Sequence, residues 1–413
     1  MQYLLPLAAA FRQTGDARFL DCYRAKVGSF ASVNPMGRGV QWTCTMEVGI
    51  RVFNLLSSYE LLRCGLCEDD PMHTVIAELA FCHGEHIWAN LETSARLQEN
   101  NHYIADLLGL AAVVAAYPNL PKARKWGEYT HNELMRCVRK QVLDDGCCFE
   151  RSTRYTRLMG EMLFFAGKCF AETPYKLPAE YFERLSILGR FLDAVTNKDG
   201  RYLQVGDNDS GRVVCISPER YDDLRLVSRL VDREIGPDAP DEAFFAEEEL
   251  FYGASGRVAC FPSWRGGART FYDAGMALAR YGDWSLGFFA SDGFVDESEP
   301  GHTHNDKLSF TLGFKGVPFF VDPGSGVYTR DPKVRNILRG TAQHSTLRFG
   351  NLEQNEFRGL FGYTRCGGAS LDVAEADGTV VFRGATDCWA TRLGVTHKRV
   401  VEVGSEGVAV KDD

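Results

Sequence analysis

Two imidazoles and a carboxylate lie close together in segment 301–310, directly before an alternating apolar run. His302, His304 and Asp306 occur at every second position, so an extended backbone would turn all three side chains to one face. The alternation continues through 308–314 and predicts a strand with one buried face. Imidazole and carboxylate groups in this pattern are typical of a cation site or of a site of proton transfer.

Two further residues of the same types follow in the chain. Asp322 precedes Pro323, and His344 follows Gln343, each at the edge of a strand-like run. Nitrogen and oxygen ligands without thiolates suit zinc or manganese, with calcium as a further alternative. The competing interpretation is a buried, hydrogen-bonded polar network at one end of a β-domain.

A second candidate segment combines amides and an imidazole. Asn100, Asn101 and His102 precede an Ala- and Leu-rich helical run that ends before Pro118. An asparagine at a helix start is ordinarily a cap, because its side chain accepts a free backbone N–H. An amide and an imidazole at the positive end of a helix would also bind a carboxylate. The segment taken alone is compatible with both interpretations.

A third candidate segment places three arginines around a tyrosine, at 151–157. The ordinary interpretation is the solvated first turn of a helix, with Tyr155 at the end of an apolar stripe. In the functional interpretation, a nearby cation lowers the pKa of Tyr155, as an acid or base near neutral pH requires. Arg154 or Arg157 could also hold an anionic sugar.

Two other charged segments have ordinary explanations. Asp207 begins a stretch that matches a calcium loop at only three positions and reads as a turn. Near His344, the residues Arg330, Lys333, Arg335 and Arg339 form a basic run. A solvated helix face is the usual explanation, although this run is also the one locally basic place in an acidic chain.

Composition limits the class of protein. The chain has 413 residues, 45% of them hydrophobic, and a formal net charge of -9. This length can bury two sizeable cores, and the acidic balance argues against a general nucleic-acid binder. The sequence shows neither an apolar run of membrane-spanning length nor a signal peptide. We expect a cytoplasmic protein, or a periplasmic or secreted one if a leader precedes this chain.

The chain contains thirteen cysteines, without the distribution of a disulfide scaffold. Cys82, Cys137 and Cys169 fall at apolar positions of helical runs, where a thiol serves as a small hydrophobe. Cys64 and Cys67 have the spacing of a metal or redox pair, but no second pair follows at zinc-ribbon distance. The pattern favours reduced, structural thiols.

The order of the elements predicts two domains. Apolar spacing predicts helices over 46–62, 101–117, 155–169 and 178–195, and the acidic segment 236–242 reads as a linker. Short alternating runs then predict strands over 257–262, 276–281, 285–290, 308–314, 379–384 and 399–410. Helices followed by strands indicate an α+β multidomain protein. We expect a helical domain over 1–245 and an antiparallel β-domain over 246–413, with the latter cut short at its end.

Together these motifs resemble those of the heparinase II/III-like polysaccharide lyases. The matching segments occur in the family's order and cover nearly the whole chain: 42–51, 100–102, 152–157, 206–209, 301–310, 321–324 and 343–346. The resemblance implies an N-terminal α/α toroid, here lacking its opening helices, followed by an antiparallel β-sandwich. It also implies β-elimination at a uronic acid residue of an anionic glycan, either a glycosaminoglycan or an alginate-like uronan.

The resemblance further implies roles for single residues. Asn101 would neutralise the uronate carboxylate with help from His102. Tyr155 would be the general acid, with a second role as base as the alternative, and His302 would be the partner base for one sugar epimer. The implied metal ligands are His304, Asp322 and His344, with zinc first. The implied substrate contacts are Glu47, Arg339 and, as second tyrosine, Tyr328.

Two other functions stay open at this point. A glycoside hydrolase on an α/α toroid would need a carboxylate pair, for which Glu47 and Asp207 are available but not visibly paired. A non-catalytic protein that binds or assembles acidic polysaccharides would keep the same surface without turnover. Both alternatives share the expected partner, an acidic polysaccharide or oligosaccharide. The sequence leaves the oligomeric state open.

Overall fold

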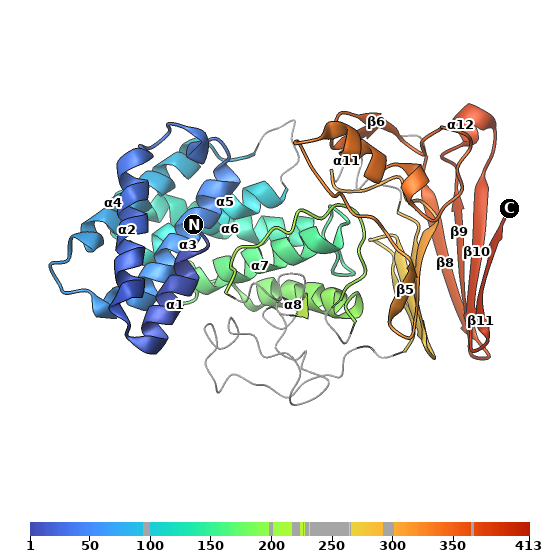
Figure 1. The fold of residues 1–413 in the computed structure, drawn as a ribbon, viewed down its shortest axis with the longest axis horizontal. Coiled ribbons are helices and arrows are strands. Elements are labelled where there is room, and N and C mark those ends of the chain that lie inside the picture. Colours follow the sequence, from blue (N-terminus) through green and yellow to red (C-terminus); the bar gives the residue numbers. More distant parts are fainter. Residues whose placement is uncertain are drawn as a thin grey trace.

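The computed structural model describes residues 1–93, 100–197, 201–216, 266–291, 301–364 and 367–413, together with 224, 225, 227, 231 and 264. Helices form the N-terminal part and antiparallel strands form most of the C-terminal part. The two parts occupy opposite ends of the long axis of the molecule (Figure 1). The predicted α+β architecture is confirmed. The expected boundary at 245/246, the linker 236–242 and the strand 257–262 lie outside the described residues.

The helical part is built from neighbouring helices joined by short connections. The core that they enclose is continuous and rich in Leu, Val and Phe. No helix among the described residues has both the length and the apolarity of a membrane span. The helices are α1 (Leu4–Thr14), α2 (Ala17–Val33), η1 (Val40–Trp42), α3 (Thr45–Leu62), η2 (Arg63–Gly65), α4 (Pro71–Ala89), α5 (Asn101–Ala116), α6 (Ala123–Gln141), α7 (Thr153–Phe170) and α8 (Ala179–Ala194).

Helices α3 and α5 pack closely near their first turns. A Cβ atom on Gly49 would lie 2.2 Å from the carbonyl oxygen of Ala105, and one on Gly109 would lie 2.7 Å from the Cα atom of Gly49. Neither position has room for a side chain, so glycine sets how closely the helix backbones approach. This contact fixes the first turn of α5, which carries Asn101 and His102, against the first turn of α3.

Polar caps begin the two helices that carry the candidate residues. The side chain of Asn100 accepts a hydrogen bond from the backbone N–H of His102 at 3.0 Å, and Ser152 accepts one from Tyr155 at 3.3 Å. Each cap satisfies a backbone donor that the helix itself leaves free. Asn100 is therefore a cap, and the neighbouring Asn101 is left for another role.

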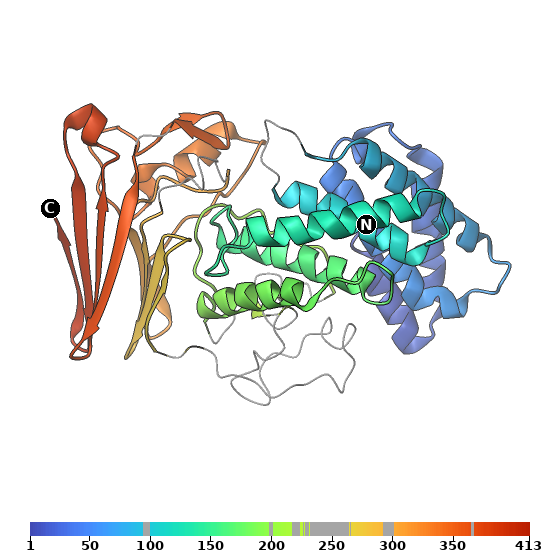
Figure 2. The same cartoon turned by 180° about the vertical axis from the view of Figure 1, so that it is seen from behind.

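The C-terminal part is a sandwich of two antiparallel sheets (Figure 2). The rings of Phe288 and Phe382 stack across the sandwich with centroids 6.0 Å apart. The first sheet has the order β1 (Gly267–Phe271), β2 (Met276–Tyr281), β3 (Trp284–Phe289), β4 (Ser309–Phe314), β5 (Val317–Phe320); the second has the order β11 (Gly407–Asp412), β10 (His397–Gly404), β9 (Thr379–Thr386), β8 (Ala369–Ala376). Shorter elements complete this part: α11 (Pro332–Leu338), η4 (Thr341–Gln343), β6 (Glu356–Arg358), β7 (Gly362–Thr364) and α12 (Ala390–Leu393).

Two strand predictions need correction. The predicted run 399–410 is a hairpin, in which β10 and β11 pair in register up to Gly404 opposite Gly407. The strand after the histidine segment begins at Ser309, and Leu308 before it has a positive φ of 58°. Segment 301–308 is consequently a loop, so His302, His304 and Asp306 do not share a strand face.

A connection after α8 joins the two parts. Within segment 201–216, the backbone N–H of Asp207 donates to the carbonyl oxygen of His302 at 2.9 Å, and the hydroxyl of Ser152 donates to the carbonyl of Asp207 at 2.7 Å. On the sandwich side, Arg280 donates to the carbonyl of Thr196 at 2.7 Å. The start of α7, the Asp207 loop and loop 301–308 are thereby held together, and the candidate residues lie here.

Candidate active site

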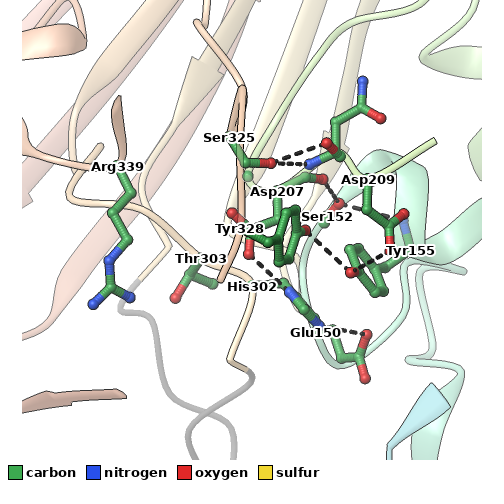
Figure 3. A network of polar contacts seen from close by, with 12 residues as sticks. Glu150, Ser152, Tyr155, Asp207, Asp209, His302, Thr303, Ser325, Tyr328 and Arg339 are labelled. Carbon is green, nitrogen blue, oxygen red and sulfur yellow. Dashed lines mark hydrogen bonds and ion pairs between the residues drawn. The ribbon is translucent and has the colours of Figure 1, made fainter. Parts of the chain in front are cut away.

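Tyr155 and His302 come from different parts of the molecule and stack on each other (Figure 3). Tyr155 lies in the first turn of α7, whereas His302 lies in the loop before β4. Their ring centroids are 3.6 Å apart and the ring planes differ by 16°. The structure therefore brings together the phenol and the imidazole that the sequence nominates as acid and base.

Asp207 fixes the orientation of His302. Its buried carboxylate accepts hydrogen bonds from Nδ1 of His302 at 2.8 Å and from Nε2 of His304 at 2.9 Å. Both terminal nitrogens of Arg335 donate to the same carboxylate, at 2.5 and 2.6 Å. Burial by itself raises the pKa of Asp207, but these donors outweigh it and hold the pKa well below the ordinary 3.8.

The charge on Asp207 decides which nitrogen of His302 is free to react. An ionised carboxylate can only accept hydrogen bonds, so Nδ1 of His302 carries a proton, and in the neutral imidazole the lone pair is on Nε2. Nε2 lies 3.9 Å from Oε2 of Glu150. The imidazole is thus held in the tautomer that a general base requires.

The phenol of Tyr155 belongs to a short chain of hydroxyl contacts. Its O–H donates to Oδ2 of Asp209 at 2.9 Å, and the hydroxyl of Tyr328 lies 3.1 Å away. Burial, followed by the nearby Asp209 and Tyr328, raises the pKa of Tyr155 well above its usual 10.0. The predicted lowering of this pKa is therefore wrong. A phenol that keeps its proton at neutral pH suits a general acid.

The two arginines nearest to Tyr155 in the sequence bind other side chains and do not supply the cation that would lower its pKa. Arg154 donates to Oδ1 of Asn208 at 3.2 Å, and a nitrogen of Arg157 lies 3.1 Å from Oε2 of Glu161. Their exposed fractions are 2% and 0%. Both guanidinium groups are buried, and the expected sugar contacts of Arg154 and Arg157 stay predictions.

Arg339 is also buried and is held by the protein itself. It donates to the carbonyl oxygen of Gly359 at 2.9 Å and lies between the rings of Phe357 and Tyr363, at 4.4 and 4.6 Å from their centroids. In Figure 3 it lies apart from the Tyr155–His302 pair. Arg339 is fully buried, and its expected substrate contact stays a prediction.

Asn101 faces a carboxylate that the sequence interpretation overlooked. Its amide nitrogen lies 2.9 and 3.1 Å from the two oxygens of the fully buried Glu150, and its backbone N–H donates to the same group at 3.1 Å. The amide and the backbone N–H of Asn101 are thus both directed at one carboxylate. Burial raises the pKa of Glu150.

His102 lies beside Asn101 and is paired with Glu92. Its Nδ1 atom is 2.5 Å from Oε2 of Glu92. Burial lowers the pKa of His102, but contacts with Cys44 and Glu92 outweigh it and raise the pKa to about 10. The imidazole is consequently protonated at neutral pH, which places a positive charge at the start of α5.

His304, Asp322 and His344 converge on one point, and their candidate ligand atoms lie within 4.8 Å of one another. Nδ1 of His304 and Nε2 of His344 are buried without a hydrogen bond among the described residues, whereas Oδ2 of Asp322 lies 3.1 Å from Nδ1 of His344. Nε2 of His304 donates to Asp207, which leaves the lone pair on Nδ1. Because such atoms are costly to bury unused, the donor set fits a divalent cation.

The remaining candidates are Glu47 and Tyr328. Tyr328 reaches the site, although loop 321–331 is far from α7 in the chain, and Arg335 stacks on its ring with 4.7 Å to the centroid. Glu47 is exposed in the first turn of α3. Its contact with substrate stays a prediction.

Four residues of the site were missed or misread: Glu150, Asp207, Asp209 and Arg335. Each is a charged residue in a segment that reads as a turn or a solvated helix, whereas Glu150, Asp207 and Arg335 are buried. The sequence did hold one indication that Asp207 is functional, because it lies in segment 206–209, which matches the family. Arg335 offered only its spacing of four from Arg339, which puts both on one helix face.

Comparison with known proteins decides the family. The description "Heparinase II/III N-terminus" matches residues 1–194, and "Heparinase II/III-like, C-terminal" matches residues 265–413. The chain belongs to the heparinase II/III-like family. The resemblance based on short motifs is therefore confirmed over both parts of the chain.

Individual relatives of this heparinase II/III-like chain are distant. It is 22% identical to a heparin-sulfate lyase of Pedobacter heparinus over 357 residues, which are 84% of this chain and 50% of that protein. A crystal structure of heparinase III superposes with a TM-score of 0.71 at 18% identity, covering 100% of this chain and 61% of the other. A Streptomyces coelicolor chondroitin AC lyase in complex with chondroitin sulphate gives 0.52 at 15% identity, covering 94% and 60%. The chain thus spans about half the length of the curated relative.

The structural matches concern the fold. They place the helical part with the toroids and the strand-rich part with the β-sandwiches of heparinase-like proteins. The predicted fold class, an α/α toroid followed by an antiparallel sandwich, is confirmed.

Proposed function

We propose that this chain carries the active site of a polysaccharide lyase that cleaves a uronic-acid-containing glycosaminoglycan by β-elimination. The stacked pair of Tyr155 and His302 carries the proposal, because it sets a protonated phenol beside an imidazole lone pair. The names of relatives support the substrate class, since one is a heparin-sulfate lyase and another structure contains chondroitin sulphate.

The reaction needs a proton acceptor and a proton donor. Nε2 of His302 takes the proton from the carbon beside the carboxyl group, for the sugar epimer that presents this proton to it. The hydroxyl of Tyr155 gives its proton to the oxygen of the leaving sugar as the C–O bond breaks and the C=C bond forms. Asp209 and Tyr328 hold the phenol oxygen in place through their contacts of 2.9 and 3.1 Å.

The uronate carboxylate needs donors, because the proton beside it is not acidic while the carboxylate keeps its full charge. The first turn of α5 offers the amide of Asn101 and the protonated imidazole of His102. Glu150 positions the amide through two contacts. Donors of this kind stabilise the charge that develops as the proton leaves.

A divalent cation held by His304, Asp322 and His344 belongs to the proposal, with zinc first and manganese or calcium as alternatives. When bound, the cation would supply positive charge next to the buried Asp207 network. The chain's own contribution is to keep His304 oriented, because Asp207 accepts the proton on its Nε2 at 2.9 Å.

The test is a digestion panel of heparan sulfate, chondroitin sulfate and alginate with the purified protein. We expect ultraviolet absorbance of unsaturated uronate to rise together with new reducing ends on a glycosaminoglycan. New ends without this absorbance would indicate a glycoside hydrolase instead. Binding without new ends across the panel would indicate a polysaccharide-binding protein, and either result would overturn the proposal.

A further inference from the structure

A thiol, a carboxylate and an imidazole converge at the edge of the site. We propose that Cys44, Glu92 and His102 form a separate site for a thiolate-binding divalent transition metal such as zinc. The site does not depend on the proposed function.

The three side chains come from three segments of the chain. Cys44 precedes α3, Glu92 follows α4, and His102 is in the first turn of α5. Their candidate ligand atoms all lie within 4.8 Å of one another. Tetrahedral zinc holds such atoms at about 2.0–2.3 Å, which puts ligands roughly 3.5 Å apart. Nδ1 of His102 and Oε2 of Glu92 are 2.5 Å apart, so these two atoms must separate by about 1 Å to enclose an ion.

Hydrogen bonds hold Glu92 in place in the absence of a metal. Oε1 of Glu92 accepts from the backbone N–H of Thr45 at 3.0 Å, and the backbone N–H of Glu92 donates to the buried Asp106 at 2.7 Å. The hydroxyl of Thr45 donates to the carbonyl of Asn90 at 2.9 Å. These bonds hold the loop after α4 on the first turn of α3, so binding requires little further ordering.

The donor set also selects the kind of ion. A thiolate and an imidazole favour zinc, cobalt or cadmium over magnesium or calcium, which prefer oxygen ligands. The site is open to solvent, because the side chains of His102 and Glu92 are 42% and 27% exposed. The group of His304, Asp322 and His344 has no sulfur, so the two groups differ in a property that a spectrum detects.

A metal at this site would replace the proton on Nδ1 of His102, the nitrogen that faces Glu92. The N–H at Nε2 would remain a hydrogen-bond donor. Because thiol and imidazole must lose protons to bind, the affinity for the metal rises with pH.

The binding test uses cobalt(II) with the purified full chain. We expect a sulfur-to-cobalt charge-transfer band that saturates with a single equivalent. Cys44→Ser should lose the band. Glu92→Gln should keep it, with an affinity for cobalt at least tenfold lower. Because Cys64 and Cys67 are exposed and form a competing pair, the matched control is Cys64→Ser with Cys67→Ser, which keeps the band.

Absence of the band from the wild-type chain, or its survival in Cys44→Ser, would overturn the site. Circular dichroism of each variant shows whether it is folded, and Glu92→Gln provides the second route if Cys44→Ser is not. The binding result does not require turnover, so its failure is distinguishable from a failure of the proposed function.

Discussion

The rings of Tyr155 and His302 lie face to face, with centroids 3.6 Å apart. This contact joins the helical part to the sandwich at the point where both candidate proton-transfer groups are buried. Because the two rings are in contact, the phenol and the imidazole are direct neighbours in the folded chain. The activity consequently depends on the relative position of the two parts of the chain.

Replacing His302 tests the base. His302→Gln should lower turnover by about 10²–10⁴-fold on glycans whose reactive proton faces this ring, because a general base contributes about that much. The fold should survive, since one hydrogen bond to Asp207 is lost. His131→Gln is the control, because this half-buried histidine also makes one hydrogen bond, to Tyr175 at 2.9 Å. Unchanged turnover of His302→Gln on every cleaved glycan would contradict the role.

Asp207→Asn should destabilise the protein and slow it. Arg335 would keep a buried charge without its partner, which typically costs about 3–5 kcal/mol. His302 would also lose the acceptor that selects its tautomer. Urea unfolding gives the stability and steady-state assays give the rate. A variant with wild-type stability would show that the Asp207–Arg335 pair does not hold the two parts together.

The stability of the wild type should fall steeply in acid. The pKa of Asp207 lies well below its ordinary 3.8 in the folded state, so the unfolded state binds the proton first as the pH falls. This contribution is present above the ordinary value and is lost as the pH drops toward the folded pKa. Urea midpoints between about pH 5 and pH 2 should therefore converge for the wild type and Asp207→Asn. Parallel curves would contradict the lowered pKa.

Asp209 should act by positioning Tyr155. In Asp209→Asn the phenol loses its charged acceptor at 2.9 Å, and the pKa of Tyr155, which Asp209 helps to raise, should fall. The alkaline limb of the pH–rate profile should shift to lower pH by the same amount. A change in rate without any shift of the profile would indicate a structural role alone.

The metal group of the sandwich can be tested by removal. His304→Ala should remove one zinc and lower the thermal unfolding temperature, by roughly 2–4 °C for each kcal/mol lost, and chelation should have at least the same effect. Elemental analysis before and after chelation measures the ion directly. Freshly purified protein without any bound divalent ion would refute the assignment of His304, Asp322 and His344.

Local periodicity predicted the helices of the site well. The run expected over 46–62 is α3 at Thr45–Leu62, and the run over 101–117 is α5 at Asn101–Ala116. Such patterns depend only on neighbouring residues. The hairpin after His397 was not predicted, because β10 and β11 form one continuous apolar run in the sequence, with the turn inside it. Alternation alone does not reveal where a strand reverses.

Burial of charge could not be predicted in the same way. Asp207 and Arg335 are 128 residues apart, and only the tertiary fold makes them partners. The sequence therefore presents Arg335 as part of a solvated basic face and Arg157 as a sugar contact, whereas both side chains are fully buried. Tyr155 shows the same limit, because its pKa depends on Asp209 and on burial, and not on the adjacent arginines.

The most direct test of the central claim is the mass of the product released by the wild type and by Tyr155→Phe from the glycosaminoglycan cleaved best. Elimination predicts an oligosaccharide lighter by one water than the hydrolysis product, and turnover of Tyr155→Phe should fall by about 10²–10⁴-fold. Tyr59→Phe is the control, since this tyrosine hydrogen-bonds His73 in the helical part. A product carrying the added water, or full turnover of Tyr155→Phe, would contradict the account.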